Sequence, residues 1–112
     1  MKILVFAGTT EGRRIAEYLN DTVADSYVSV ATEYGGRLLE EYQHLHLLTG
    51  RMDEDEIAAF LSEKKIDLVI DATHPFAVLV TGNIKRACER AEVRYLRCLR
   101  EEEHLAEEID PI

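Results

Sequence analysis

The feature that most constrains the fold of this chain is a regular alternation between two hydrophobic periods. One is a short continuous apolar run, such as residues 2–7 (KILVFA), which is typical of a strand covered on both faces. The other is a stripe of small and apolar residues at helical spacing, such as positions 12, 15, 16 and 19. The strand-like runs are residues 2–7, 26–32, 44–48, 67–71 and 93–99, and the helical stripes lie within residues 12–19, 38–42, 53–61 and 76–91.

Strands that alternate with helices through short connections predict right-handed crossovers and a parallel sheet. We therefore expect an α/β, Rossmann-like three-layer sandwich with about five mainly parallel strands and helices on both faces. Asp53 and Glu56 have the spacing of a capping box, which predicts where the helix over residues 53–61 begins.

The length, charge and cysteine content of the chain exclude several classes of protein and of partner. The 112 residues are enough for one compact domain, and 46% of them are hydrophobic. No apolar run approaches the roughly 20 residues of a membrane span, and the start lacks the pattern of a signal peptide, so a cytoplasmic location is expected. The formal charge of −9 argues against nucleic acid or an anionic membrane as a partner. Cys88 and Cys98 lack a CxxC partner and are interpreted as core residues, with a redox or disulfide role as the less favoured alternative.

A glycine-bounded loop, Gly8-Thr9-Thr10-Glu11-Gly12, follows the first strand, at the edge where parallel sheets bind ligands. Gly8 allows a tight exit, and the free N–H groups of the following helix suit an anion. Thr9 or Thr10 can cap that helix or bind a phosphate. Gly12 continues the helical stripe, so it is expected to let the helix pack closely on the sheet, and a side chain there is expected to disturb the site more than the fold. The G-x-x-x-G spacing matches no standard phosphate-binding fingerprint, so a tight turn without a ligand stays an alternative.

A second polar stretch, residues 71–76 (DATHPF), follows the fourth strand-like run. Thr73 and His74 precede the rigid Pro75 and place a polar pair at the mouth of the sheet. The first and fourth strands are neighbours across the switch point of a doubly wound sheet, so we expect both loops at one edge. The alternative for His74 is a turn histidine whose hydrogen bonds are satisfied locally.

Together these segments resemble the precorrin-6A reductases, also called cobalt-precorrin-6A reductases. The resemblance rests on AGTTEGRRIAEYL (7–19), ATEYGG (31–36), GRMDEDEI (50–57) and IDLVIDATHPFA (66–77), and it extends over most of residues 1–100. It implies NADPH-dependent reduction of a ring double bond of precorrin-6A or cobalt-precorrin-6A, a tetrapyrrole substrate, in cobalamin (vitamin B12) biosynthesis. Members of that family continue into a second α/β domain. The resemblance therefore implies that residues 1–98 are the N-terminal domain, that residues 99–112 are an acidic linker or the start of an interdomain helix, and that the chain's partner is its own C-terminal domain.

The resemblance also implies roles for individual residues. His74 and Glu11 are the candidate proton donors, with water as an alternative donor. Arg13, like Arg14, is alternatively a solvated charge on the helix face. Glu33 would favour NAD in an ordinary Rossmann arrangement, whereas the family uses NADPH. The residues expected to bind the cofactor are Gly8, Thr9, Thr10, Glu11, Gly12, Arg13, Thr32 and Arg37, and those expected to bind the substrate are Thr73, His74, Pro75 and Phe76.

Other interpretations of the same residues stay open. A non-catalytic nucleotide- or anion-binding module of the same fold would use the same loops. A phosphoacceptor receiver domain is disfavoured because Asp71 has no acidic pair after the first strand. His44 and His46 would share a strand face, but no third ligand accompanies them, so no metal site is expected.

Overall fold

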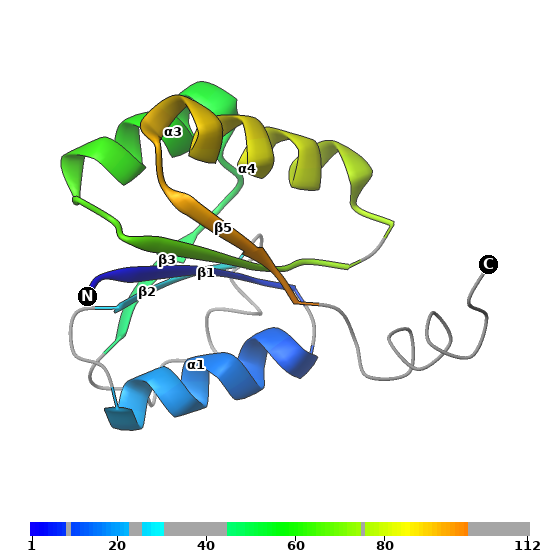
Figure 1. Ribbon diagram of the computed structural model, residues 1–112. Helices are drawn as coiled ribbons and strands as arrows, with labels where there is room; N and C mark the ends of the chain where they lie inside the picture. The colour runs from blue at the N-terminus through cyan, green and yellow to red at the C-terminus, as the bar shows by residue number, and fades with distance from the viewer. Residues whose placement is uncertain (9, 23–25, 31–44, 75, 99–112) are drawn as a thin grey trace, which may run out of the picture.

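The computed structural model describes residues 1–8, 10–22, 26–30, 45–74 and 76–98. Strands and helices alternate along these residues as the hydrophobic periods predict (Figure 1), except between the second and third strands, where residues 31–44 lie outside the described ranges. In chain order the elements are β1 (Ile3–Ala7), α1 (Thr10–Thr22), β2 (Ser26–Val30), β3 (Leu45–Thr49), α3 (Glu54–Glu63), β4 (Leu68–Ala72), α4 (Val78–Ala91) and β5 (Arg94–Arg97).

The five strands form one sheet in the order β3-β2-β1-β4-β5, and every neighbouring pair is parallel. This confirms the predicted α/β, Rossmann-like fold. The chain moves outward from β1 to β3 and then crosses back to β4, so β1 pairs with β2 on one side and with β4 on the other. Phe6 is in register with Asp71 and Ala7 with Ala72, so β1 and β4 end level with each other.

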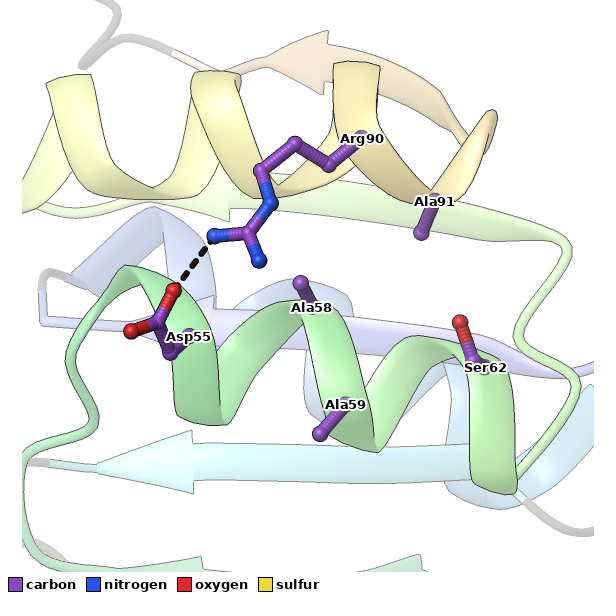
Figure 2. Close-up of a pocket in the computed structure, with 6 residues that line it drawn as sticks. All are labelled: Asp55, Ala58, Ala59, Ser62, Arg90 and Ala91. Atoms are coloured by element: carbon purple, nitrogen blue, oxygen red, sulfur yellow. Dashed lines mark hydrogen bonds and ion pairs between the residues drawn. The ribbon is translucent and has the colours of Figure 1, made fainter.

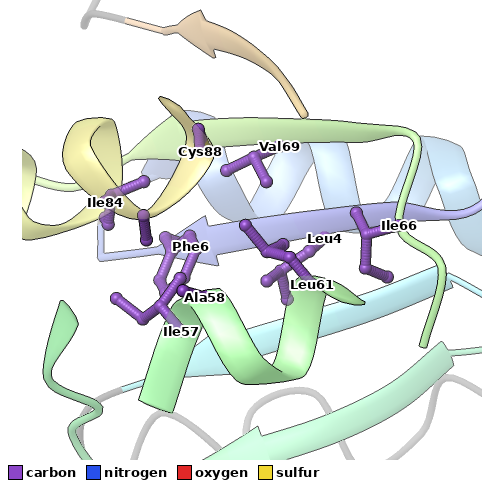
Figure 3. Close-up of a cluster of buried hydrophobic side chains, with 10 residues drawn as sticks. Leu4, Phe6, Ile57, Ala58, Leu61, Ile66, Val69, Ile84 and Cys88 are labelled. Atoms are coloured by element: carbon purple, nitrogen blue, oxygen red, sulfur yellow. The ribbon is translucent and has the colours of Figure 1, made fainter. Parts of the chain in front are cut away.

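Helix α1 covers one face of the sheet, while α3 and α4 cover the other (Figure 1). Alternate side chains of β1 point toward α1 and toward α3 and α4. Both faces of the strand are thus buried, which explains why residues 2–7 form a continuous apolar run. On the side of α1, one buried cluster is Ile3, Val5, Leu19 and Ile70, and a second is Ala16, Val28 and Val30. On the side of α3 and α4 (Figure 3), the buried cluster is Leu4, Phe6, Ile57, Ala58, Leu61, Ile66, Val69, Ile84, Ala87 and Cys88.

Helix α4 begins later than the hydrophobic stripe suggested. The stripe placed Phe76 in the helix, whereas the first helical residue is Val78. The physical reason is a turn before the helix, in which the Ala77 N–H donates to the carbonyl of His74 at 2.9 Å. Phe76 is therefore part of the turn. The helix expected over residues 38–42 and the end of the strand expected over 26–32 lie outside the described residues.

Several smaller predictions can be compared with the structure. The capping box is confirmed, because Glu56 N–H donates to Asp53 Oδ1 at 2.8 Å and Asp53 N–H donates to Glu56 Oε1 at 3.1 Å. Both cysteines are free thiols, with Cys88 on the buried side of α4 and Cys98 half-buried. His46 is exposed on β3, with its ring centroid 4.8 Å from that of Tyr27. Within the described ranges, no cluster of three or more histidine, cysteine or acidic residues has the arrangement of a metal site, and no helix has the length and apolar content to cross a membrane.

Candidate functional site

The loop after β1 and the turn after β4 lie against each other at the carboxyl edge of the sheet. The Gly8 N–H donates to the carbonyl of Ala72 at 3.3 Å. A β-carbon placed on Gly8 would lie 3.5 Å from Thr73 Cα and 3.8 Å from the main-chain nitrogen of His74. Glycine therefore keeps a side chain out of the space between the two segments. The prediction that both segments share one edge of the sheet is confirmed.

Gly12 allows α1 to approach the sheet very closely. A β-carbon on Gly12 would stand 2.8 Å from Ala7 Cα, 3.0 Å from Ala7 Cβ and 3.2 Å from Ala72 Cβ. The predicted packing role is thus confirmed. The expectation that a side chain here would largely spare the fold is wrong, because the nearest atom belongs to the backbone of β1 and cannot rotate away.

The other residues expected to bind the cofactor are described to different extents. Thr10 and Glu11 are in the first turn of α1, and their side chains lie outside the described part of the structure. Arg13 is exposed on α1, with its Nε 3.8 Å from Oε1 of Glu17, one helical turn on. That position agrees with the solvated-charge alternative for Arg13. Thr9, Thr32, Arg37 and Pro75 lie outside the described residues.

The turn after β4 orients the imidazole of His74. The Phe76 N–H donates to His74 Nδ1 at 3.2 Å, and the two rings lie 5.1 Å apart at an angle of 38°. Because Nδ1 accepts this hydrogen bond, the proton of a neutral His74 imidazole lies on Nε2. The exposed imidazole therefore offers an Nε2–H donor to a ligand at this edge.

A buried polar network, which the sequence did not predict, lies directly beneath the turn. Asp71 is 0% exposed. Its Oδ1 accepts hydrogen bonds from Thr73 N–H (3.1 Å), Thr73 Oγ1 (2.6 Å) and Arg97 Nη1 (3.1 Å), and its Oδ2 accepts one from the Tyr95 hydroxyl (2.6 Å). Thr73 Oγ1 also lies 3.2 Å from Thr81 Oγ1 on α4. We call Asp71, Thr73, Thr81, Tyr95 and Arg97 the Asp71 network.

Burial and the Asp71 carboxylate shift the pKa values of two groups, Tyr95 of the network and Cys88 of α4. Burial, and then the hydrogen bond to the Asp71 carboxylate, raises the pKa of Tyr95 far above its ordinary value. Burial, and then the negative charge of Asp71, raises the pKa of the Cys88 thiol to about 11. The raised pKa keeps the Tyr95 hydroxyl protonated well above pH 7, as the hydrogen bond that it donates to Asp71 requires. A buried carboxylate bound in this way cannot serve as an accessible phosphoacceptor, which argues against the receiver-domain alternative.

An apolar patch borders the turn. Phe76, Val78 and Leu79 are 85%, 73% and 75% exposed, respectively. They come from the turn and from the first residues of α4, whose N-cap, Ala77, makes no side-chain capping bond. Three large apolar side chains on the rim of a polar turn are suited to a ligand with an extended apolar face.

A separate hollow lies on the outer side of the helical layer. It has a volume of about 300 Å³ and is lined by Asp55, Ala58, Ala59, Ser62, Arg90 and Ala91 (Figure 2). An ion pair of 2.6 Å joins Arg90 and Asp55 across it. Arg90 is 12 residues after Val78, which is about 18 Å along α4. This hollow is therefore distinct from the candidate site at the sheet edge.

Comparisons with known proteins agree on one family. The family model described as "Precorrin-6x reductase CbiJ/CobK" matches residues 2–111. The cobalt-precorrin-6A reductase of Methanocaldococcus jannaschii is 32% identical over 94% of this chain and 42% of its own length. That of Salmonella typhimurium is 35% identical over 90% of this chain and 38% of its own. A solved structure described as "CobK precorrin-6A reductase" has a TM-score of 0.74 at 31% identity, covering 87% of this chain and 38% of that chain. The chain thus spans well under half the length of these relatives.

Proposed function

The chain belongs to the precorrin-6A reductase family of cobalamin biosynthesis, and we propose that it forms the N-terminal half of a two-domain reductase. In this proposal residues 1–98 are the Rossmann-like domain and residues 99–112 lead into the second domain, which is this domain's partner. The proposal is supported by the coverage of the relatives, since this chain matches 42% and 38% of the lengths of two of them. The cytoplasmic location expected from the sequence stays a prediction.

The proposed reaction is the NADPH-dependent reduction of a ring double bond of precorrin-6A or cobalt-precorrin-6A. NADPH, when bound, supplies the hydride. The observation that carries this proposal is the meeting of Gly8 with Thr73 and His74 at the carboxyl edge of β1 and β4. In open α/β sheets this edge, at the switch point, is where dinucleotides bind.

The residues of the first loop fit the phosphates of a dinucleotide. Gly8 leaves the space beside Thr73 and His74 without a side chain, and the first-turn N–H groups of α1 begin directly after this loop. We propose that Gly8 and the residues between Gly8 and Gly12 face the cofactor. Gly12 is proposed to contribute by letting α1 pack closely on the sheet, and the exposed Arg13 by its positive charge near the cofactor. Thr32 and Arg37 are proposed to bind its adenosine side, with Arg37 on a 2′-phosphate.

The turn after β4 is proposed to face the tetrapyrrole. The exposed ring of Phe76, with Val78 and Leu79 beside it, provides an apolar surface for the macrocycle. The Nε2–H of His74 is a hydrogen-bond donor next to that surface. Proton delivery after hydride transfer is assigned to His74 or Glu11, with water as the alternative donor.

The test is NADPH oxidation by the full-length protein that carries this chain, assayed with precorrin-6A and with cobalt-precorrin-6A. We expect turnover with one or both substrates, and little or none from the 112-residue chain alone. Full activity from that chain alone would contradict the two-domain proposal. A full-length protein that binds NADPH but does not oxidise it would favour the non-catalytic binding module.

A substitution of Phe76 tests the substrate face. Phe76→Ser should lower kcat/KM for the macrocycle by roughly 10- to 100-fold, the equivalent of one apolar side chain buried on binding. Its thermal melt should be unchanged, because Phe76 is 85% exposed. Tyr18→Ser, at another exposed aromatic residue on the outer side of α1, is the matched control and should leave kcat/KM unchanged.

A further inference from the structure

Arg97 holds the backbone on both sides of Ala72. Its Nη1 lies 3.1 Å from the main-chain oxygen of Asp71 and 2.9 Å from that of Thr73. The same nitrogen lies 3.1 Å from Asp71 Oδ1 and 3.2 Å from Thr73 Oγ1. One arginine nitrogen thus fixes the path of the chain as it leaves β4 and enters the turn.

Arg97 is in turn fixed by the elements around it. It is in register with Asp71 across the β4–β5 pair, and the Cys98 N–H donates to the main-chain oxygen of Asp71 at 2.9 Å. Its side chain is only 21% exposed. The hydroxyls of Tyr95 and Thr81 complete the network from β5 and α4. The guanidinium therefore acts as a rigid anchor instead of a solvated charge.

The part of the chain that Arg97 holds is the wall of the candidate site. The atoms that a side chain on Gly8 would meet are Thr73 Cα and the main-chain nitrogen of His74. A shift of Thr73 would consequently alter the space between the loop and the turn and move the His74 imidazole with it. Displacements of about 1 Å in a binding site can change a rate by about 100-fold.

We propose that Arg97 is a positioning residue, which holds Thr73 and His74 at their distance from Gly8 without itself touching cofactor or substrate. Its effect on turnover rests on the proposed function, whereas its effect on the geometry of the turn does not. Lysine at this position would keep the positive charge, but its single ammonium cannot reproduce the planar, branched geometry of a guanidinium.

The geometric part is tested by NMR on the ligand-free, full-length protein. Arg97→Met should shift the amide signals of Thr73 and Phe76 and the imidazole signals of His74. Arg97→Lys should restore part of each shift. Arg94→Met is the matched control, because Arg94 is exposed on the same strand, and it should leave these signals in place. If Arg97→Met does not fold, Arg97→Lys decides the question through the same signals.

The kinetic part uses the KM for the macrocycle. Partial unfolding lowers the amount of active enzyme but leaves KM unchanged, so KM separates positioning from a loss of stability. We expect Arg97→Met to raise this KM about tenfold and Arg97→Lys to raise it less. Turn signals that do not move, or that move equally in Arg94→Met, would overturn the proposal, as would shifted signals with an unchanged KM. A wild-type protein without turnover would refute the proposed function, while the NMR comparison would still decide the role of Arg97 in the turn.

Discussion

Asp71 and Ala72 are consecutive residues of β4, yet they belong to two differently built regions of the site. Ala72 faces α1, where its Cβ would lie 3.2 Å from a β-carbon on Gly12. Asp71 faces α4 and β5, where it accepts hydrogen bonds from Thr73, Tyr95 and Arg97. The first region depends on small residues that let α1 pack closely on the sheet. The second depends on polar side chains that hydrogen-bond to one another.

The difference predicts how each region responds to substitution. On the side of α1 the sensitive quantity is volume, because backbone and methyl groups are already in contact. On the side of α4 it is hydrogen bonding, because the buried Asp71 carboxylate depends on its donors Thr73, Tyr95 and Arg97. Substitutions can therefore change the region facing α1 and the region facing α4 separately.

The largest effect is expected from Asp71→Ala, which tests the polar region. The substitution leaves the Arg97 guanidinium and the Tyr95 hydroxyl without their carboxylate, and breaking a buried ion pair costs about 3–5 kcal/mol. Denaturant unfolding of the variant and of the wild type measures this cost. The control is Asp55→Ala, because Asp55 is 84% exposed where it pairs with Arg90, and exposed pairs contribute about 1 kcal/mol or less. Equal costs for the two variants would show that burial does not distinguish them.

A smaller effect is expected from Gly12→Val, which tests the region shaped by volume. The new side chain meets the backbone of Ala7 at 2.8 Å, and overpacking of this kind costs about 1–3 kcal/mol. Gly82→Ala is the matched control, because a β-carbon there meets only the movable end of Arg86. That control should be neutral or stabilise α4 by up to about 1 kcal/mol. A Gly12→Val protein as stable as Gly82→Ala would contradict the close approach of α1.

The smallest effect at neutral pH tests the surroundings of Cys88 on α4, where burial and then the Asp71 charge favour the protonated thiol. Folding raises the pKa of Cys88 from 9.0 to about 11, so the folded state holds this proton more tightly than the unfolded state. The resulting stability is fully present below pH 9 and is lost as the pH rises from 9 to 11. The loss is on the order of 2 kcal/mol. In Cys88→Ala, the free energy of unfolding should fall less steeply over this range than in the wild type. Identical slopes would show that the thiol makes no contribution.

The fold could be read from the sequence because its signals are local. Residues 2–7 are apolar at every position since both faces of β1 are covered, and the stripe at 12, 15, 16 and 19 marks the covered side of α1. The placement of the loop after β1 and the turn after β4 at one edge of the sheet also followed from the sequence. It requires only that β1 and β4 be neighbours, which the order of a doubly wound sheet supplies.

The Asp71 network could not be read in the same way, because it depends on register. The pairing of Asp71 with Arg97 is set by how β4 and β5 align, and no local pattern states that alignment. One signal was present, since an acidic residue at the end of an apolar buried strand requires a partner. Tyr95 and Arg97, two residues apart on the next strand, were the candidates to provide it.

The central place of β1 in the sheet has a consequence for the chain as it is made. Synthesis delivers β1, β2 and β3 first, so one edge of β1 has no strand to pair with until residues 68–72 have left the ribosome. An unpaired edge that is rich in isoleucine, valine and phenylalanine is a template for association with other chains. Two outcomes therefore depend on one event, the pairing of β4 with β1. This pairing protects the nascent chain from aggregation, and it also forms the Gly8–Thr73 contact.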